Sequence, residues 1–423
     1  MFQVLSRSWA LLIGMMLLMV GNGLQGTLLG VRGGIEGFST FEMSIVMSAY
    51  FAGFLGGSRL APEMIRRVGH VRVFAALASF ISAILILYPA FAHPVAWALG
   101  RVVIGFCFSG VYVTAESWLN NSSDNANRGK ALSVYMIVQM FGIVSAQALL
   151  AMGDASGYAL FILSSVLVSI SFAPILLSIS PTPAFETAKP MPLKTLLETS
   201  PLGCFGMFLL GGVFSAQFGM SAVYGVAAGL TITQISIFVS SIYVGALLMQ
   251  YPIGWFSDRM DRRVVIMIVA AAGGVFSLLA LFFDYYFGAL LVAAFVIGGT
   301  SNPLYSLLIA YTNDYLDPDD MAAASGGLIF INGMGAIAGP LVTGWMMDSF
   351  GAQAFFGMIA LLMLILAGYA VYRMTQRSRA GIENQYGRDG AYAPVLPSAS
   401  PVAVEVASEY YIETALEDET NET

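Results

Sequence analysis

The chain has 423 residues, of which 58% are hydrophobic and only 10% are charged. Soluble domains have roughly a quarter of their residues charged, so a soluble protein of this size could not bury this much apolar surface, whereas a lipid bilayer accepts it. A net charge of −7 without a basic patch excludes nucleic acid as a partner.

Apolar stretches follow one another from the start of the chain, each near the 20 or so residues that a membrane span needs. The first follows Arg7 and is too long for a signal peptide. We predict twelve spans: 9–30, 43–61, 73–92, 95–119, 131–152, 158–180, 201–228, 232–256, 264–283, 286–313, 322–347 and 352–373.

A long polar interruption lies near the middle of the spans, at 181–200, and contains four prolines. It is typical of a linker between two halves. We therefore predict an N-terminal six-helix bundle at 1–180, a cytoplasmic linker at 181–200 and a C-terminal six-helix bundle at 201–373. For residues 374–423 we predict an acidic, disordered cytoplasmic tail. Seven acidic residues in this tail account for the net charge: Glu405, Glu409, Glu413, Glu417, Asp418, Glu419 and Glu422.

The basic residues support this arrangement of spans. If the N-terminus is cytoplasmic, 16 of the 18 Lys and Arg residues fall in cytoplasmic segments, as the positive-inside rule predicts. The exceptions are Arg32 and Arg101, the latter within a span. The charge pattern predicts an even number of spans with both chain ends in the cytoplasm.

The two halves resemble each other in sequence. Tyr50 and Tyr243 lie in matching Ser-x-Tyr segments of spans two and eight, and each span is followed by a basic loop. Gln139 of span five likewise matches Asn332 of span eleven. Internal duplication around a central linker is a feature of transporters whose site lies between two repeats.

The loop after span eight reads Gly254-Trp-Phe-Ser-Asp258-Arg-Met-Asp-Arg-Arg263. It closely resembles the signature loop of the major facilitator superfamily, Gly-x-Leu-Ala-Asp-Arg-x-Gly-Arg-Arg, with Asp261 replacing the second Gly. A degraded copy follows span two. Span four adds Arg101-x-x-x-Gly105 and a Glu116 element that precedes Arg128-Gly129. More narrowly, the sequence is similar to the YcaD-like branch of this superfamily, over residues 1–375.

The resemblance implies two pseudo-symmetric six-helix bundles and a cytoplasmic latch formed by Asp258, Arg262 and Asp314. It further implies a looser counterpart in the first half, in which Arg66 or Arg67 meets Glu116 and Arg128. Gly254 has no side chain and so allows span eight to approach a neighbour closely. The predicted gating residues are Gly254, Asp258, Arg259, Arg262, Arg263, Asp314, Glu116, Arg128, Arg66 and Arg67. The alternative is that these charges only set topology.

Arg101 is the most informative single residue. An Arg within a span costs about 2.5–3.5 kcal/mol on insertion scales, so it should face a partner or water. We expect it to anchor an anionic substrate or a carboxylate in a central cavity, the alternative being an Arg that reaches the outer interface. Other polar residues of the spans are further cavity candidates: Asn22, Gln25, Gln139, Gln217, Tyr224, Asn302 and Tyr305.

We therefore predict a monomeric, multi-pass transporter of the cell membrane that moves a small solute by alternating access and uses no cofactor or metal. A polar or anionic organic molecule is slightly preferred, and efflux of amphipathic compounds is the alternative. A membrane enzyme is disfavoured because two histidines cannot supply a catalytic cluster. A receptor or scaffold on the same fold stays open. The coupling ion, proton or sodium, is not established, because Glu116 is the only carboxylate within a span.

Overall fold

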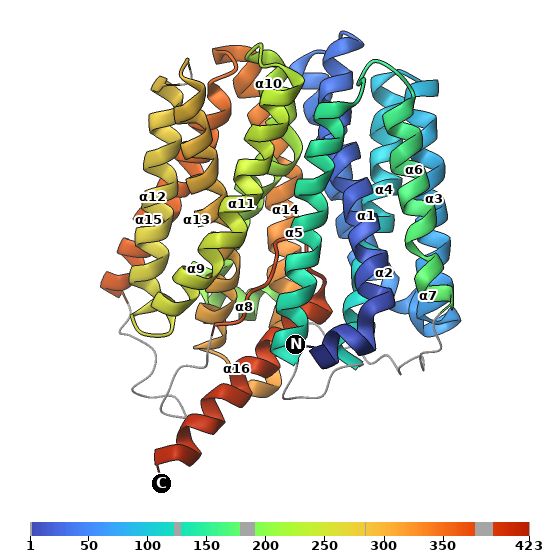
Figure 1. The fold of residues 1–423 in the computed structure, drawn as a ribbon. Coiled ribbons are helices and arrows are strands. Elements are labelled where there is room, and N and C mark those ends of the chain that lie inside the picture. The colour runs from blue at the N-terminus through green and yellow to red at the C-terminus, as the bar shows by residue number, and fades with distance from the viewer. Residues whose placement is uncertain (1, 122–127, 178–190, 284, 377–391, 423) are drawn as a thin grey trace.

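The computed structural model describes the chain except residues 1, 122–127, 178–190, 284, 377–391 and 423. The described residues form helices and no strand. Figure 1 shows the long helices side by side in one bundle, with both chain ends at its lower end. We call this the basic end, because it holds Arg66 and Arg67, Arg262 and Arg263; the opposite end is the far end.

The first half consists of α1 to α7. Their bounds are α1 Phe2–Ile35, α2 Thr40–Val68, α3 His70–Ala90, α4 Pro94–Asn121, α5 Arg128–Met152, α6 Ala159–Ser171 and α7 Ala173–Leu177. Local sequence explains several ends: Ser39 and Glu42 form a capping box at the start of α2, which satisfies free backbone N–H groups there. Gly69 ends α2 with a φ of 86°, a conformation that favours glycine.

The second half consists of α8 to α15. Their bounds are α8 Leu193–Thr199, α9 Pro201–Ser215, the π-helix η2 Ala216–Met220, α10 Ser221–Ala227, α11 Ile232–Ser257, α12 Arg262–Phe283, α13 Phe287–Asn313, α14 Pro318–Phe350 and α15 Ala354–Gln376. Thr231 and Gln234 cap α11 as Ser39 and Glu42 cap α2. Of the predicted linker 181–200, residues 181–190 lie outside the described part of the chain, and most of the remainder forms α8.

Eleven helices of the described chain are long and apolar enough to cross a membrane. Each predicted span is helical within a few residues of its predicted bounds, so the all-helical membrane fold is confirmed. The exception to the apolarity criterion is α2, which contains small and polar residues such as Gly56, Gly57 and Ser58 yet is 29 residues long. The count of twelve spans and the cytoplasmic position of the chain ends stay predictions.

The contacts between helices repeat from one half to the other. In the first half α2 packs on α4, α1 on α5 and α3 on α6; in the second half α11 packs on α13, α9 on α14 and α12 on α15. The halves meet where α2 contacts α14 and where α5 contacts α11. These two interfaces exchange equivalent helices, as expected for two repeats related by a pseudo-twofold axis.

Glycines set the closest of these approaches. A Cβ at Gly53 of α2 would collide with the carbonyl oxygen of Val102 in α4, and one at Gly245 of α11 would collide with that of Phe295 in α13. Both halves therefore have a glycine at this helix contact, because the neighbouring backbone occupies the space of a side chain.

The C-terminal segment differs from the prediction of a disordered tail. Helix α16 spans Pro401–Glu422, and Val395, Ser400 and Val404 are each 2% exposed or less. Residues 392–404 contain no charged side chain, so they can bury apolar surface, whereas the acidic character of the tail begins only at Glu405. We call residues 392–414 the C-terminal segment. The predicted tail's residues 377–391 lie outside the described chain.

Candidate functional site

A small cavity of about 50 Å³ lies between the two halves. Its walls come from α2, α4 and α5 on one side and from α9, η2, α11, α13 and α14 on the other. Three amide side chains line it, those of Gln139, Asn302 and Asn332. None of the described lining residues is charged. An enclosed space with apolar walls and a few polar groups is the usual form of a small-molecule site.

Aromatic rings from both halves meet at this cavity. The ring centroid of Tyr50 lies 5.6 Å from that of Phe218, and the Phe51 centroid lies 6.3 Å from that of Phe214. Phe214 and Phe218 are stacked at 5.8 Å. Offset and edge-to-face ring contacts at such distances are favourable, so the walls present ring surfaces suited to a planar apolar group.

A π-helical turn positions one of these rings. η2 interrupts the helix formed by α9 and α10 and contains Gln217 and Phe218. A π turn adds a residue to the helical repeat and is frequent at functional sites. Phe218 lines the cavity, whereas Gln217 accepts a hydrogen bond from the Ser301 hydroxyl at 3.0 Å.

Arg101 does not line the cavity, contrary to the prediction. Its side chain is fully buried, with its guanidinium carbon 4.6 Å from the ring centroid of Tyr50. Nη1 donates to Gln25 Oε1 at 3.1 Å. Tyr50 lines the cavity, so Arg101 lies behind an aromatic wall and is partnered by an amide and a ring. It does not reach the outer interface either.

Asn22 and Gln25 extend this buried network and also stay behind the wall. Gln25 Nε2 donates to Asn22 Oδ1 at 3.1 Å, and Asn22 Nδ2 donates to the hydroxyl of Tyr112 at 3.4 Å. Tyr112 itself lines the cavity. A chain of hydrogen bonds thus connects Arg101 to the cavity wall without exposing it.

The remaining predicted cavity residues divide into two groups. Gln139 and Asn302 do line the cavity. Tyr224 stacks on Phe355 with ring centroids 5.1 Å apart, and Tyr305 is fully buried, so neither lines it. Asn332 also lines the cavity and was not among the predicted residues, although its match to Gln139 was the available signal.

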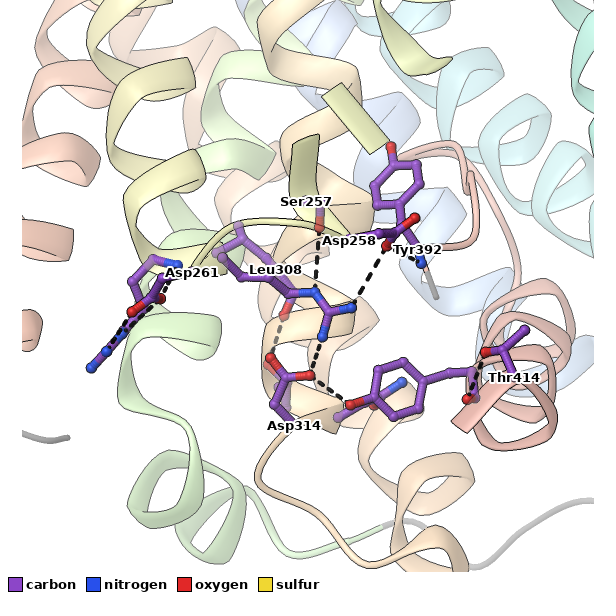
Figure 2. A network of polar contacts seen from close by, with 12 residues as sticks. Ser257, Asp258, Asp261, Leu308, Asp314, Tyr392 and Thr414 are labelled. Atoms are coloured by element: carbon purple, nitrogen blue, oxygen red, sulfur yellow. Dashed lines mark hydrogen bonds and ion pairs between the residues drawn. The ribbon is translucent and has the colours of Figure 1, made fainter. Parts of the chain in front are cut away.

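The polar network at the basic end brings together the three residues of the predicted latch (Figure 2). Arg262 pairs with the Asp314 carboxylate, and its Nη2 lies 3.9 Å from Asp258 Oδ1. Its Nε donates to the Ser257 hydroxyl at 3.3 Å. Arg262 and Asp314 are both buried. All three belong to the second half, at the ends of α11 and α13 and the start of α12.

The C-terminal segment completes this network. The Tyr411 hydroxyl donates to Asp314 Oδ1 at 2.6 Å, and the Tyr392 N–H donates to Asp258 Oδ1 at 2.7 Å. Figure 2 shows Tyr392 directly beside Asp258. Burial raises the pKa of the Asp258 carboxyl, and the Tyr392 N–H and the charges of Arg262 and Arg259 oppose this shift. The uncharged run 392–404 was the sequence signal for the contact made by Tyr392.

Among the residues whose side chains the structure describes, Arg66 and Arg67 do not meet Glu116 as the first-half counterpart predicts. Arg66 and Arg67 both bind Glu63, with nitrogen–oxygen distances of 2.8 and 2.6 Å, because the three residues share one exposed helix face. Glu116 instead accepts the N–H of Ser400 at 2.8 Å. The side chain of Arg128 lies outside the described part of the chain.

The other residues of the signature loop have local roles. Arg259 stacks on Trp255, 4.2 Å from the ring centroid, and Arg263 binds Asp261 at 2.6 Å. Gly254 approaches the C-terminal segment: a Cβ there would lie 2.5 Å from Cδ1 of Tyr392. The close approach predicted for Gly254 is therefore made to this segment.

Comparison with known proteins identifies the family of this chain. A family model described as Major Facilitator Superfamily matches residues 11–231 and, in a second match, residues 203–407. A relative from Escherichia coli O45:K1 (strain S88 / ExPEC), an uncharacterized MFS-type transporter YcaD, is 26% identical over 356 residues, which are 83% of this chain and 91% of the relative.

Solved structures share the fold. A mutant of the nucleoside transporter NupG gives a TM-score of 0.74 at 16% identity, covering 86% of this chain and 99% of that one. A bacterial homolog of the human lysosomal transporter Spinster, in an inward-facing and occupied conformation, gives a TM-score of 0.70 at 14% identity, covering 87% of this chain and 96% of that one.

Proposed function

Since the chain belongs to the major facilitator superfamily and is a multi-pass transporter of the cell membrane, we propose that it moves an uncharged, ring-bearing solute through the cavity between its halves. The observation behind this proposal is the composition of the cavity wall. Aromatic rings from both halves and three amides line it, and no described lining residue is charged.

The physical argument concerns desolvation. A charged solute would lose water in this cavity and find no opposite charge there, which is costly in an apolar site. A planar, neutral solute would stack on the faces of rings that line the cavity, such as those of Tyr50 and Phe218. The amides of Gln139, Asn302 and Asn332 both donate and accept hydrogen bonds, so they suit a solute with polar edges.

The duplicated interfaces support a mechanism of alternating access. The α2–α14 and α5–α11 contacts are equivalent under exchange of the halves, so rocking one half against the other opens one end as the other closes. The rings of Phe214 and Phe218 face those of Tyr50 and Phe51 across this boundary, and they would separate in the motion.

The preference for an anionic solute depended on Arg101 lying in the cavity. The position of Arg101 behind Tyr50 weakens this preference. It is kept as the second candidate because the Arg101 Nε has no hydrogen-bond partner in the described structure. A rearrangement of Tyr50 would bring the guanidinium toward the cavity.

Thermal unfolding of the purified chain in detergent distinguishes the neutral ring-bearing solute from the anionic one. The panel contains uncharged nucleosides such as uridine and adenosine, and small organic anions such as succinate. A ligand at 100 times its Kd stabilises by about 2.7 kcal/mol. We expect stabilisation by neutral ring compounds that Gln139→Ala removes and Arg101→Met retains. Stabilisation by anions that Arg101→Met removes would reverse the assignment, and no stabilisation by either class would contradict the proposed site.

A further inference from the structure

The C-terminal segment occupies the basic end of the boundary between the halves. In Figure 1 it enters the bundle beside α14 and α5, and α16 then leaves at the lower end. Helix α16 contacts α4 and α5 of the first half and α13 and α14 of the second. The segment therefore touches both halves, although it belongs to neither repeat.

Its backbone is held by buried side chains from both halves. Val395 donates its N–H to Ser306 Oγ at 2.8 Å, and the same hydroxyl donates to the Val395 carbonyl at 3.0 Å. From the other half, Glu116 accepts the Ser400 N–H at 2.8 Å. Extended backbone can be buried only where partners satisfy its N–H and C=O groups. α4 and α13 therefore form a binding site for this segment, which we call its seat.

The tip of the segment reaches the cavity. Leu396, Pro397 and Ser398 are part of the cavity wall. Leu396 packs with Met136 and Met140 of α5 and Ala246 of α11, the two helices of one interface between the halves. The cavity is thus closed on this side by the chain's own C-terminal residues.

Helix α16 anchors the tip. Its buried face includes Ala403, Val404 and Ala407. Ser408 Oγ accepts a hydrogen bond from Asn313 Nδ2 at 3.2 Å, and the Tyr411 hydroxyl donates to Asp314, the partner of Arg262. Helix α16 is therefore part of the polar network of the signature loop. Binding of the C-terminal segment and the conformation of that loop are coupled through Asp314.

We propose that residues 392–414 are an intramolecular plug: the segment fills the basic end of the transport path, and a solute passes there only after the segment leaves its seat. The consequence for transport rests on the proposed function, whereas the seal itself does not. The test therefore measures access to the cavity without any transported solute.

The experiment uses the full-length chain with Ser58→Cys as the reporter. Ser58 lines the cavity, and the native thiols Cys107 and Cys204 are each 1% exposed. The probe is a sulfonated maleimide, applied to protein in nanodiscs. Val395→Asp places a carboxylate at a buried position, where it loses hydration without a partner, and should unseat the segment. Leu396→Asp is the second variant. Glu413→Gln, which changes a charge of the same segment without disturbing its buried face, is the matched control.

We expect slow labelling of the reporter thiol in the Ser58→Cys chain and in its combination with Glu413→Gln. In both Asp variants we expect labelling about tenfold faster or more, because labelling follows the population of the open form. Chains without the reporter serve as the fold check, since native thiols label only if the bundle opens. Fast labelling of the Ser58→Cys chain itself would overturn the plug. So would equally slow labelling in both folded Asp variants.

Discussion

Arg262 and Asp314 form a buried ion pair in which each partner has further contacts. Asp314 also accepts the Tyr411 hydroxyl, and Arg262 lies 5.4 Å from the Tyr411 ring centroid. Removing one partner of a buried pair leaves an uncompensated charge. Asp314 therefore contributes more to the free energy of unfolding than the partly exposed Asp258 does.

We predict that Asp314→Asn lowers the free energy of unfolding by about 3–5 kcal/mol, the usual cost of breaking a buried pair. Glu63→Gln is the comparison, because it weakens the exposed pairs with Arg66 and Arg67 and should change the free energy of unfolding little, since exposed ion pairs contribute little to stability. Denaturant titration in detergent measures both. If both substitutions lower the free energy of unfolding equally, the Arg262–Asp314 pair is not the buried ion pair described.

The residues of this network could be predicted from the sequence because the signature loop resembles that of a known family and its spacing is local. The position of Arg101 could not. Its insertion cost predicts that it faces a partner or water. In the structure it contacts the Tyr50 ring and Gln25, and nothing in the spacing of residues shows which ring covers a guanidinium. The same limit applies to Tyr224 and Tyr305.

Helices were predicted well because a membrane span needs one long apolar stretch, and the chain shows these clearly. The π turn at Ala216–Met220 has no comparable sequence signal. The structure differs from the predicted disordered tail over residues 392–422 for a different reason. Residues 374–423 taken together are acidic, although the run 392–404 among them contains no charged side chain.

Glycines at helix contacts give a prediction at the same scale. Gly53→Ala and Gly245→Ala each place a methyl group against a carbonyl oxygen of the neighbouring helix, so each should destabilise by about 1–3 kcal/mol. At Gly368 of α15 an added Cβ meets nothing within 4 Å. There, alanine should stabilise by up to about 1 kcal/mol through helix propensity.

The apparent melting temperature of the three glycine variants tests this. Because Gly53 and Gly245 occupy equivalent places in the two halves, their losses should be similar. A large loss in one half and none in the other would argue that the repeated contacts do not contribute equally to stability.

At the scale of the whole molecule, the cavity is closed toward both ends by different means. At the basic end the closure is the C-terminal segment. At the far end the halves contact each other directly: Ser48 Oγ donates to the Ile337 carbonyl at 2.6 Å, and Gly344 of α14 packs against Ser44 of α2. Two independent closures predict that each end can be opened without the other.

Gly344→Trp tests the far closure, because an indole at this position cannot fit against Ser44 and must push α2 and α14 apart. Overpacking of this kind costs about 1–3 kcal/mol, and each 1.4 kcal/mol changes a population tenfold. We therefore expect the Ser58→Cys reporter to label roughly tenfold faster while the C-terminal segment stays seated. Gly368→Trp, at an open position of α15, is the control and should leave labelling unchanged. If Gly344→Trp speeds labelling only in combination with Val395→Asp, the far end does not lead to the cavity, and transport by rocking the halves about this cavity is contradicted.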